Sequence, residues 1–565
     1  MLLSSSHPAA ALLAAVLAEH GVRHAVVSPG SRNAPLILAL HHHPDIEVRV
    51  SIDERSAAYH ALGLALATWT PVPVICTSGT AALNHGPALA EAFHARVPLL
   101  SITADRPADV IGRGHGQTIV QSGVHSLHTL HHHVLDESQM DEKTMTEKIR
   151  HALETAMHGG PGRCSGPVHL NIPLQEPLYD LDTAPKVQQA STQTNSTDEH
   201  GEGRWGIPEE LEKAIHRGKV LVVAGPRPPS VSSDLVEPLT INLPCLAERG
   251  ANVSGPLVVF GGERLLEGDK FPQSLQPEAI ITLGLPPMSK ALRSALGGVP
   301  HWHVGADLPH EGTGWDVWGT LKGDASVHLL LTDFGTEPFQ QWQKVSASLQ
   351  SLNEAFHPDW SDLAAWRTMA AFWENLDTDS RPRALHLANS ASARYAQWIN
   401  LENALHSKAV VYANRGVAGI DGCTSTAIGW HAEMRRIHSN HCTWLVTGDL
   451  AFHYDANAFM TDPKPQGLKI IVINNGGGGI FRWLPGVKHQ DMFERCFETP
   501  PQRSVRELAT LINAEHHEAN NSDELHAALH HSNQTTNNVV VEVVTSAAQS
   551  SHQRDLYLQS FRAIV

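Results

Sequence analysis

Residues 443–481 read TWLVTGDLAFHYDANAFMTDPKPQGLKIIVINNGGGGIF, and this stretch is the most informative about the fold. Its two apolar runs, 443–447 and 468–473, each lead into residues that suit a turn, which is typical of buried parallel strands. Asp449 follows the first run and Asn475 follows the second. Because the carboxyl ends of parallel strands lie along one edge of a sheet, we expect these side chains to meet at a ligand-binding crevice.

The residue types at this expected crevice suit a divalent cation and a phosphate. Carboxylate, amide and backbone carbonyl oxygens are ligands for a hard ion such as Mg²⁺, which also takes phosphate oxygens. The four glycines 476–479 let the backbone approach a phosphate closely. A flexible loop beside an ordinary strand-end aspartate would give the same pattern, and the pair alone does not decide between the two readings.

The same alternation of apolar runs, turn residues and Ala/Leu-rich stretches extends over most of the chain. It predicts helices at 34–43 and ending near residue 95, and Trp-rich helices within 332–383. Residues 184–204 lose hydrophobic periodicity and are expected to form a linker. The further strands are expected at 24–28, 72–77, 97–103, 219–224, 279–283, 409–413 and 538–545. We therefore predict an α/β protein with three doubly wound parallel-sheet domains.

The composition excludes several classes of protein. The 565 residues include 41 Lys+Arg and 58 Asp+Glu, a net charge of −17, which argues against a nucleic-acid partner. The longest apolar run, residues 9–18, is too short to span a bilayer, so no integral membrane segment is expected. Six scattered cysteines without a CxxC pair fit a reducing compartment. We expect a soluble, cytoplasmic protein.

Histidine is the most unusual feature of the composition, with 38 copies. Residues 41–43 are consecutive histidines, and His125, His128 and His131 follow one another at i+3 spacing. Metal binding is one reading, but the spacing matches no zinc motif. Solvated helix ends and faces are the favoured reading, and the sequence gives no reason for the excess.

A second informative segment is 51–63, SIDERSAAYHALG, where Glu54 follows an expected strand and opens an Ala-rich helix. A glutamate in a first helical turn is ordinarily a favourable charge on the helix dipole. A strand-end Glu early in the chain combined with the later GD…NN pair resembles the thiamine diphosphate (ThDP) enzyme superfamily. Within this superfamily, seven segments of the chain resemble one family in particular. It is the menaquinone-pathway 2-succinyl-5-enolpyruvyl-6-hydroxy-3-cyclohexene-1-carboxylate (SEPHCHC) synthase family, MenD. These segments are SPGSRNAPL (28–36), IDERSAAYHALG (52–63), TSGTAALN (77–84), TADRP (103–107), NRGVAGIDGCTSTAIG (414–429), GDLAFHYDANA (448–458) and GGIFRWLP (478–485).

This resemblance covers the first and last parts of the chain densely and implies a domain plan. It implies a pyrimidine-binding domain at 1–183, a linker at 184–204, a middle domain at 205–350 and a diphosphate-binding domain at 351–565. The middle domain is matched only by position and by residues 286–293. The resemblance also implies a homo-oligomer, a dimer or a dimer of dimers, in which the pyrimidine-binding domain of one subunit meets the diphosphate-binding domain of another.

The implied activity is that of a transferase, a carboligase. ThDP-dependent decarboxylation of 2-oxoglutarate leaves a succinic-semialdehyde carbanion equivalent, which adds to isochorismate in a 1,4 sense. Glu54 matches the catalytic Glu that hydrogen-bonds the aminopyrimidine ring and favours its imino tautomer. Asp449, Asn475 and the carbonyl of Gly477 match the ligands of Mg²⁺ or Mn²⁺. The implied cofactor contacts are Ser390, Ile420, Gly448, Asp449 and Leu450, with Ile420 as the apolar wedge that bends the cofactor.

Both implied substrates are dicarboxylates, so the site needs cations to overcome the repulsion of an acidic protein. Ser31 and Arg32 lie on a turn at a helix start, which favours anions. The other matching substrate positions are Arg106, Gln117, Lys290, Arg394, Arg415, Ile480 and Phe481. The assignment of Lys290 is the weakest, because the middle-domain match can slip by one residue to Ser289.

The sequence differs from the superfamily pattern in two places, and two other functions are also considered. The chain has GDL where superfamily members commonly show GDG, and glycine at 476 and 479 where many relatives carry larger side chains. Another ThDP-dependent carboligase or decarboxylase acting on a smaller oxo acid is the main alternative activity. A His-rich metal-binding or scaffold protein on a decayed enzyme fold is the alternative from another class, and intact Glu54, Asp449 and Asn475 argue against decay.

Overall fold

The computed structural model describes residues 2–159, 164–186, 208–227, 236–267, 270–304, 317–321, 336–501 and 503–561. The chain forms two compact units. Unit 1 contains Met1–Glu202, Asp421–His441 and Asp455–Pro465, and unit 2 contains Gly203–Ile420, Cys442–Tyr454 and Gln466–Val565. Beyond Lys186, the linker expected at 184–204 lies outside the described residues.

Unit 1 is built on a seven-stranded sheet, in which every neighbouring pair is parallel except β18 with β3. Its strands, in order across the sheet, are β18 (Thr461–Asp462), β3 (Glu47–Ser51), β2 (His24–Val27), β4 (Val72–Cys76), β5 (Leu99–Asp105), β7 (Val168–Pro173) and β6 (His131–Val134). β1 (Leu3–Ser5) and β8 (Leu181–Thr183) form a separate antiparallel pair. The strands expected near 24–28, 72–77 and 97–103 are confirmed.

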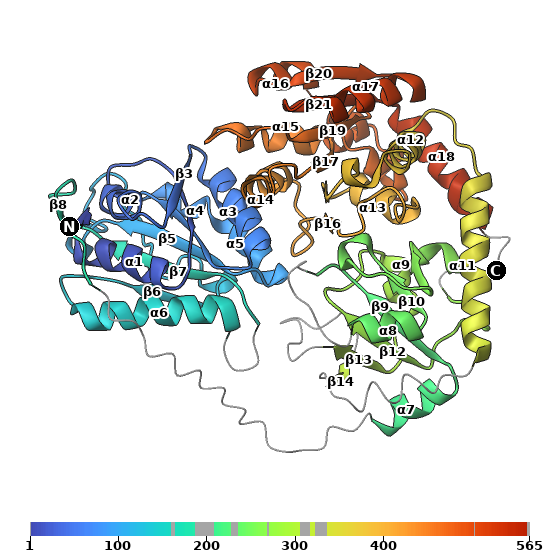
Figure 1. Cartoon of the computed structure of the whole chain (residues 1–565), viewed down its shortest axis with the longest axis horizontal. Coiled ribbons are helices and arrows are strands. Elements are labelled where there is room, and N and C mark those ends of the chain that lie inside the picture. The colour runs from blue at the N-terminus through green and yellow to red at the C-terminus, as the bar shows by residue number, and fades with distance from the viewer. Residues whose placement is uncertain are drawn as a thin grey trace. The chain divides into compact units, whose positions relative to one another are not determined.

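Helices cover both faces of this sheet (Figure 1). They are α1 (Pro8–Glu19), α2 (Ala34–His41), α3 (Glu54–Thr68), α4 (Thr80–Leu83), α5 (Gly86–Ala95), α6 (Glu142–His158) and α14 (Cys423–Ile437). The apolar faces of α1, α2 and α6 share one core with the sheet. α3 and α14 pack closely, because a Cβ on Gly63 would lie 2.1 Å from the Thr426 carbonyl oxygen.

Unit 2 contains two six-stranded sheets, and all neighbouring strands in both are parallel. The first sheet runs β11 (Val258–Phe260), β10 (Cys245–Ala247), β9 (Val220–Ala224), β12 (Ala279–Leu283), β13 (His301–Val304) and β14 (Val317–Leu321). The second runs β16 (Val410–Tyr412), β15 (Ala384–Leu387), β17 (Thr443–Gly448), β19 (Lys469–Asn474), β21 (Val539–Val544) and β20 (Glu515–Ala519). The strands expected in the last third of the chain are confirmed.

One hydrophobic core joins these two sheets through the helices between them, drawn in green, yellow and red in Figure 1. Trp366, Trp373 and Trp444 are fully buried in it. The helices of unit 2 include α7 (Glu209–His216), α8 (Val236–Asn242), α9 (Lys290–Ala295), α11 (Thr336–Ala355), α12 (Asp362–Glu374), α13 (Ala391–Trp398), α15 (Asp449–Tyr454), α16 (Val505–Leu511), α17 (Ser522–Gln534) and α18 (Ala547–Ser560). The Trp-rich helices are therefore confirmed as α11 and α12. No helix among the described residues is long and apolar enough to cross a membrane.

Candidate active site

A cavity of about 190 Å³ opens in unit 2 at the carboxyl ends of three neighbouring strands. Ser390 follows β15, Asp449 follows β17 and Asn475 follows β19. The cavity thus contains the two polar side chains that the opening stretch of sequence predicts to meet. The expected residues that line it are Ser390, Ile420, Gly448, Asp449, Leu450, Asn475, Gly477, Ile480 and Phe481.

Asp449 is the buried acid of this cavity, with 1% of its surface exposed. Its carboxylate accepts hydrogen bonds from the backbone N–H groups of Leu450 and Gly477, both at 2.7 Å. Burial raises the pKa of Asp449 to about 6, and these two hydrogen bonds oppose the rise. A buried carboxylate that has lost its hydration is strongly stabilised by a cation placed beside it.

Asn475 is oriented by an acid that the sequence analysis did not identify. Its Nδ2 donates to Asp362 Oδ2 at 2.9 Å, and Asp362 also accepts from the hydroxyls of Thr545 and Ser550. The buried Oδ1 of Asn475 has no hydrogen-bond partner among the described residues. Leaving a buried acceptor unpaired costs about 1–3 kcal/mol, so this oxygen is suited to an electropositive ligand.

The glycine loop that follows Asn475 is shaped by close backbone contacts. Gly477 has a φ of +125°, and a Cβ there would lie 2.0 Å from the Glu498 carbonyl oxygen, so no other residue fits. Its own carbonyl accepts the Gly479 N–H at 2.9 Å and keeps a second lone pair. A Cβ at Gly479 would lie 2.9 Å from Asn475 Nδ2. Glycine at 479, a departure noted above, therefore leaves the Asn475 amide room to hold its position.

This arrangement fits a divalent cation with a diphosphate. The orphaned Asn475 Oδ1, the buried Asp449 carboxylate and the Gly477 carbonyl supply oxygen ligands of the type that Mg²⁺ takes. Asp449 and Asn475 would hold the ion, and Gly448, Leu450 and Ser390 would border the phosphates. Ile420 supplies an apolar wall to the same cavity.

A second cavity of about 680 Å³ lies beside the first sheet of unit 2, and Ile480 lines both cavities. Lys290 and Arg394 line the larger cavity, as does the buried Glu248. Burial raises the pKa of Glu248 to about 7, while Arg415 and Arg394 oppose the rise. Arg415 Nη1 also donates to Asn389 Oδ1 at 2.9 Å. Two predicted cations, Arg394 and Arg415, thus lie near one buried acid that the sequence did not predict, and Lys290 lines the same cavity.

In unit 1, the predicted residues lie along the carboxyl edge of the seven-stranded sheet. Glu54 follows β3 and is the first residue of α3, as predicted. The helix is capped by Asp53, whose side chain accepts from the N–H groups of Arg55 and Ser56. Burial raises the pKa of the half-buried Glu54 carboxyl, and the Asp53 charge adds to the rise. In this environment the Glu54 carboxyl keeps its proton to a higher pH than an exposed glutamate does.

The cations of this edge follow the neighbouring strands β2 and β5. Arg32 is buried, donating to the Leu174 carbonyl oxygen at 2.8 Å and to Glu176 at 3.2 Å. Desolvation lowers the pKa of Arg32, and the charge of Arg106 lowers it further. The Nε atoms of Arg32 and Arg106 are buried without a hydrogen-bond partner in the described part of the chain. Ser31, which directly precedes Arg32 in the sequence, is exposed.

Gln117 lies against the loop that follows β4, the strand between β2 and β5. It is exposed with a φ of +56°, and a Cβ on Gly79 would come within 3.2 Å of its Cα. The predicted residues of unit 1 therefore bring two arginines and the Glu54 carboxyl to one edge of its sheet, whereas those of unit 2 bring oxygen ligands to the edge of its second sheet.

Known proteins resemble this chain over nearly all of its length. The family described as "Thiamine pyrophosphate enzyme, N-terminal TPP binding domain" matches residues 8–126. A Porphyromonas gingivalis protein named 2-succinyl-5-enolpyruvyl-6-hydroxy-3-cyclohexene-1-carboxylate synthase is 35% identical over 542 residues, which cover 90% of this chain and 89% of that protein. A Flavobacterium psychrophilum protein of the same name is 34% identical over 520 residues, covering 87% and 88%. The chain belongs to this SEPHCHC synthase family.

The fold of this chain also resembles that of a solved structure. The crystal structure of benzoylformate decarboxylase from Polynucleobacter necessarius matches with a TM-score of 0.71 at 16% identity, covering 95% of this chain and 98% of that one. This likeness shows a shared fold with several parallel-sheet α/β parts. The fold class predicted from the sequence is confirmed.

Proposed function

We propose that this SEPHCHC synthase family member decarboxylates 2-oxoglutarate and adds the remaining four-carbon unit to isochorismate in a 1,4 sense. The products are SEPHCHC and CO₂, and the pathway is that of menaquinone or phylloquinone. Family membership carries the proposal, because relatives at 34–35% identity that bear this name cover nearly the whole chain. The buried Asp449–Asn475 pair supports it with a place for the cofactor's ion.

The chain's own residues divide the work by their chemistry. Bound ThDP supplies the electron sink on which a 2-oxo acid loses CO₂. Asp449, Asn475 and the Gly477 carbonyl would hold its Mg²⁺ or Mn²⁺, and Ile420 would support the cofactor by apolar contact. Glu54 would hydrogen-bond the aminopyrimidine ring and favour its imino tautomer, a role that suits a carboxyl whose pKa is raised by burial.

The substrate carboxylates bind to guanidinium and ammonium groups from both units. Ser31, Arg32, Arg106 and Gln117 serve at the unit 1 edge. Lys290, Arg394 and Arg415 serve in unit 2, with Ile480 and Phe481 as apolar walls. A guanidinium can hold a carboxylate bidentately, and hydrogen bonds to charged groups contribute about 1.5–3 kcal/mol each.

We assign the pyrimidine-binding role to residues 1–183, the middle domain to 205–350 and the diphosphate-binding role to 351–565, with a linker at 184–204. Glu54 of one subunit then serves the cofactor held by unit 2 of a second copy. The enzyme is a cytoplasmic homodimer or a dimer of dimers, and an isolated monomer is inactive.

An assay of isochorismate consumption with purified protein, ThDP and Mg²⁺ tests the reaction. Isochorismate is expected to disappear only when 2-oxoglutarate is present, with one CO₂ released per isochorismate lost. Pyruvate in place of 2-oxoglutarate is expected to give no isochorismate loss. If CO₂ is released from an oxo acid while isochorismate is untouched, the chain is a different ThDP-dependent carboligase or decarboxylase and the proposal is wrong.

A further inference from the structure

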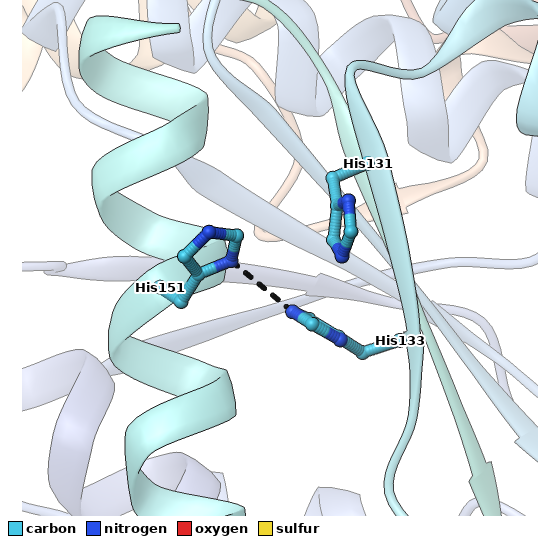
Figure 2. Close-up of side chains that lie close together, drawn as sticks. All are labelled: His131, His133 and His151. Atoms are coloured by element: carbon cyan, nitrogen blue, oxygen red, sulfur yellow. Dashed lines mark hydrogen bonds between the residues drawn. The ribbon is translucent and has the colours of Figure 1, made fainter. Parts of the chain in front are cut away.

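Three histidines of unit 1, none of them among the residues of the proposed reaction, come together at the edge strand β6 of its sheet. His131 and His133 are on β6, and His151 is on α6, which packs against that strand (Figure 2). One ring nitrogen from each lies within 4.8 Å of the others. The sequence predicts solvated positions for His125, His128 and His131, which share i+3 spacing, but His125 is buried and its Nε2 hydrogen-bonds the Ala82 carbonyl oxygen.

Strand geometry explains why these histidines converge. Side chains two residues apart on a strand point to the same face, so His131 and His133 both face α6, and His132 between them points the other way. The His131 and His133 rings are 4.2 Å apart between centroids, and the His151 ring is 5.2 and 5.3 Å from them. The three rings thus form one compact group.

The distances suit a tetrahedral ion. His133 Nε2 and His151 Nδ1 are 3.2 Å apart. Two ligands of a tetrahedral zinc with Zn–N bonds of about 2.0–2.1 Å are about 3.3–3.4 Å apart, so this pair already has nearly the required separation. His131 needs only a side-chain adjustment, because its ligand atom is within 4.8 Å of both.

The protonation state also suits metal binding. Burial, together with the nearby His131, Lys148, His151 and His132, lowers the pKa of His133 to about 4. Burial likewise lowers the pKa of His131. Neutral imidazole is the form that binds a transition metal, so the lowered pKa values of His131 and His133 favour metal binding.

We propose that His131, His133 and His151 bind a divalent transition-metal ion of the Zn²⁺ class, which links the edge strand β6 to α6. Three imidazoles leave a fourth position for water, on the side where His151 is exposed. Imidazole selects Zn²⁺, Ni²⁺ or Cu²⁺, whereas the oxygen-lined cavity of unit 2 suits Mg²⁺, so the two sites take different ions. The proposal does not depend on the proposed reaction.

A second group, Glu515, His517 and His531, has comparable spacing but is the weaker candidate. Its carboxylate already pairs with His531 and accepts from Asn537 and Thr535. An ion there would have to break an existing ion pair. The first group loses only the hydrogen bond between His133 and His151.

Titration of the full-length, tag-free protein with Co²⁺, in saturating Mg²⁺, tests the site through the visible absorption of a four- or five-coordinate ion. Wild type is expected to show these bands at one equivalent. His133→Ala and His151→Ala are expected to weaken binding by at least about tenfold, the lower end of what lost support for a metal costs. His132→Ala is the matched control from the same strand and is expected to bind normally.

Two further variants make the result specific. Glu515→Gln combined with His517→Ala is expected to leave the bands in place, because it disables only the second group. Lys148→Gln is expected to tighten binding a few-fold, since it removes a cation that faces His131 and His133. Zn²⁺ is expected to raise the melting temperature of wild type and His132→Ala, but not of His151→Ala. Because His151 is exposed, its replacement is expected to leave folding intact.

The proposal is overturned if His133→Ala and His151→Ala bind Co²⁺ as wild type does. It is also overturned if the bands disappear in His132→Ala or in the Glu515/His517 variant, because binding would then lie elsewhere among the 38 histidines.

Discussion

The carboxyl edges of the unit 1 sheet and of the second sheet in unit 2 have the same strand geometry and opposite chemistry. In unit 2, the Asp449 carboxylate accepts hydrogen bonds from two backbone N–H groups, and the Asn475 amide donates one to Asp362. In unit 1, Arg32 and Arg106 lie near each other with buried Nε atoms unpaired among the described residues, and Glu54 is the lone predicted acid. Under the proposed function one edge binds a cation and the other binds anions, so variants in each should fail differently.

The largest effect is expected from Glu54→Gln, which should lower kcat by about 10²–10⁴-fold, the usual worth of an acid–base group. Because Glu54 belongs to unit 1, the variant should still bind ThDP and Mg²⁺, as measured by quenching of protein fluorescence. Glu142→Gln is the matched control, since Glu142 is also a first helical residue but is exposed. Equal losses in both variants would contradict the assignment.

In contrast to Glu54→Gln, Asp362→Asn is expected to weaken cofactor binding. Asp362 fixes Asn475 through the 2.9 Å hydrogen bond, so its loss should weaken Mg²⁺-dependent ThDP binding by about 10–100-fold. Activity should return at high Mg²⁺, which distinguishes a positioning role from misfolding. Asp359→Asn, in the exposed turn before α12, should leave binding unchanged. A lower kcat that no Mg²⁺ concentration restores would show that Asp362 does something else.

A smaller effect is expected when the anion-binding edge is weakened. Arg106→Ala should raise the KM for one dicarboxylate by about tenfold, because a charged hydrogen bond at the lower end of its usual range contributes about 1.5 kcal/mol. ThDP binding should not change. Steady-state kinetics with each substrate varied in turn would measure this, with the exposed Arg113→Ala as control. A change in cofactor affinity instead of KM would remove Arg106 from the substrate site.

The smallest effect is expected from the pH response of Glu248. Its pKa is raised to about 7, so the carboxyl is neutral below this pH and becomes a carboxylate as pH rises through it. The new charge competes with substrate for Arg394 and Arg415, so KM should rise a few-fold above pH 7. Glu248→Gln cannot ionise and should have a flat KM over the same range. Parallel KM profiles for the two proteins would contradict this role.

The sequence predicted the strand-end residues well, because a βα pattern fixes which edge each of them occupies. Asp449, Asn475 and the helix-opening Glu54 all lie where the pattern places them. Their roles came from family resemblance and stay predictions. The domain boundary expected at 350/351 lies within α11, and unit 1 includes residues 421–441 and 455–465 from the last third of the chain.

Residues brought in by packing could not be predicted. Asp362 opens α12, where an acid normally reads as a first-turn charge, and only the fold aims it at Asn475. Glu248 follows β10, a three-residue strand too short for its periodicity to be recognised. His151 lies in an amphipathic helix with nothing in its local sequence to connect it to His131 and His133.

Coexpression of two inactive chains tests the central claim that both edges serve one active site built from two copies. Glu54→Gln and Asp449→Asn chains are each expected to be inactive alone. In a random mixture, half of the dimers pair one chain of each kind, and each such dimer has one intact site, so about a quarter of wild-type activity should return. If the mixture stays inactive while mixed dimers are shown to form, the two edges do not combine across subunits and the account is wrong.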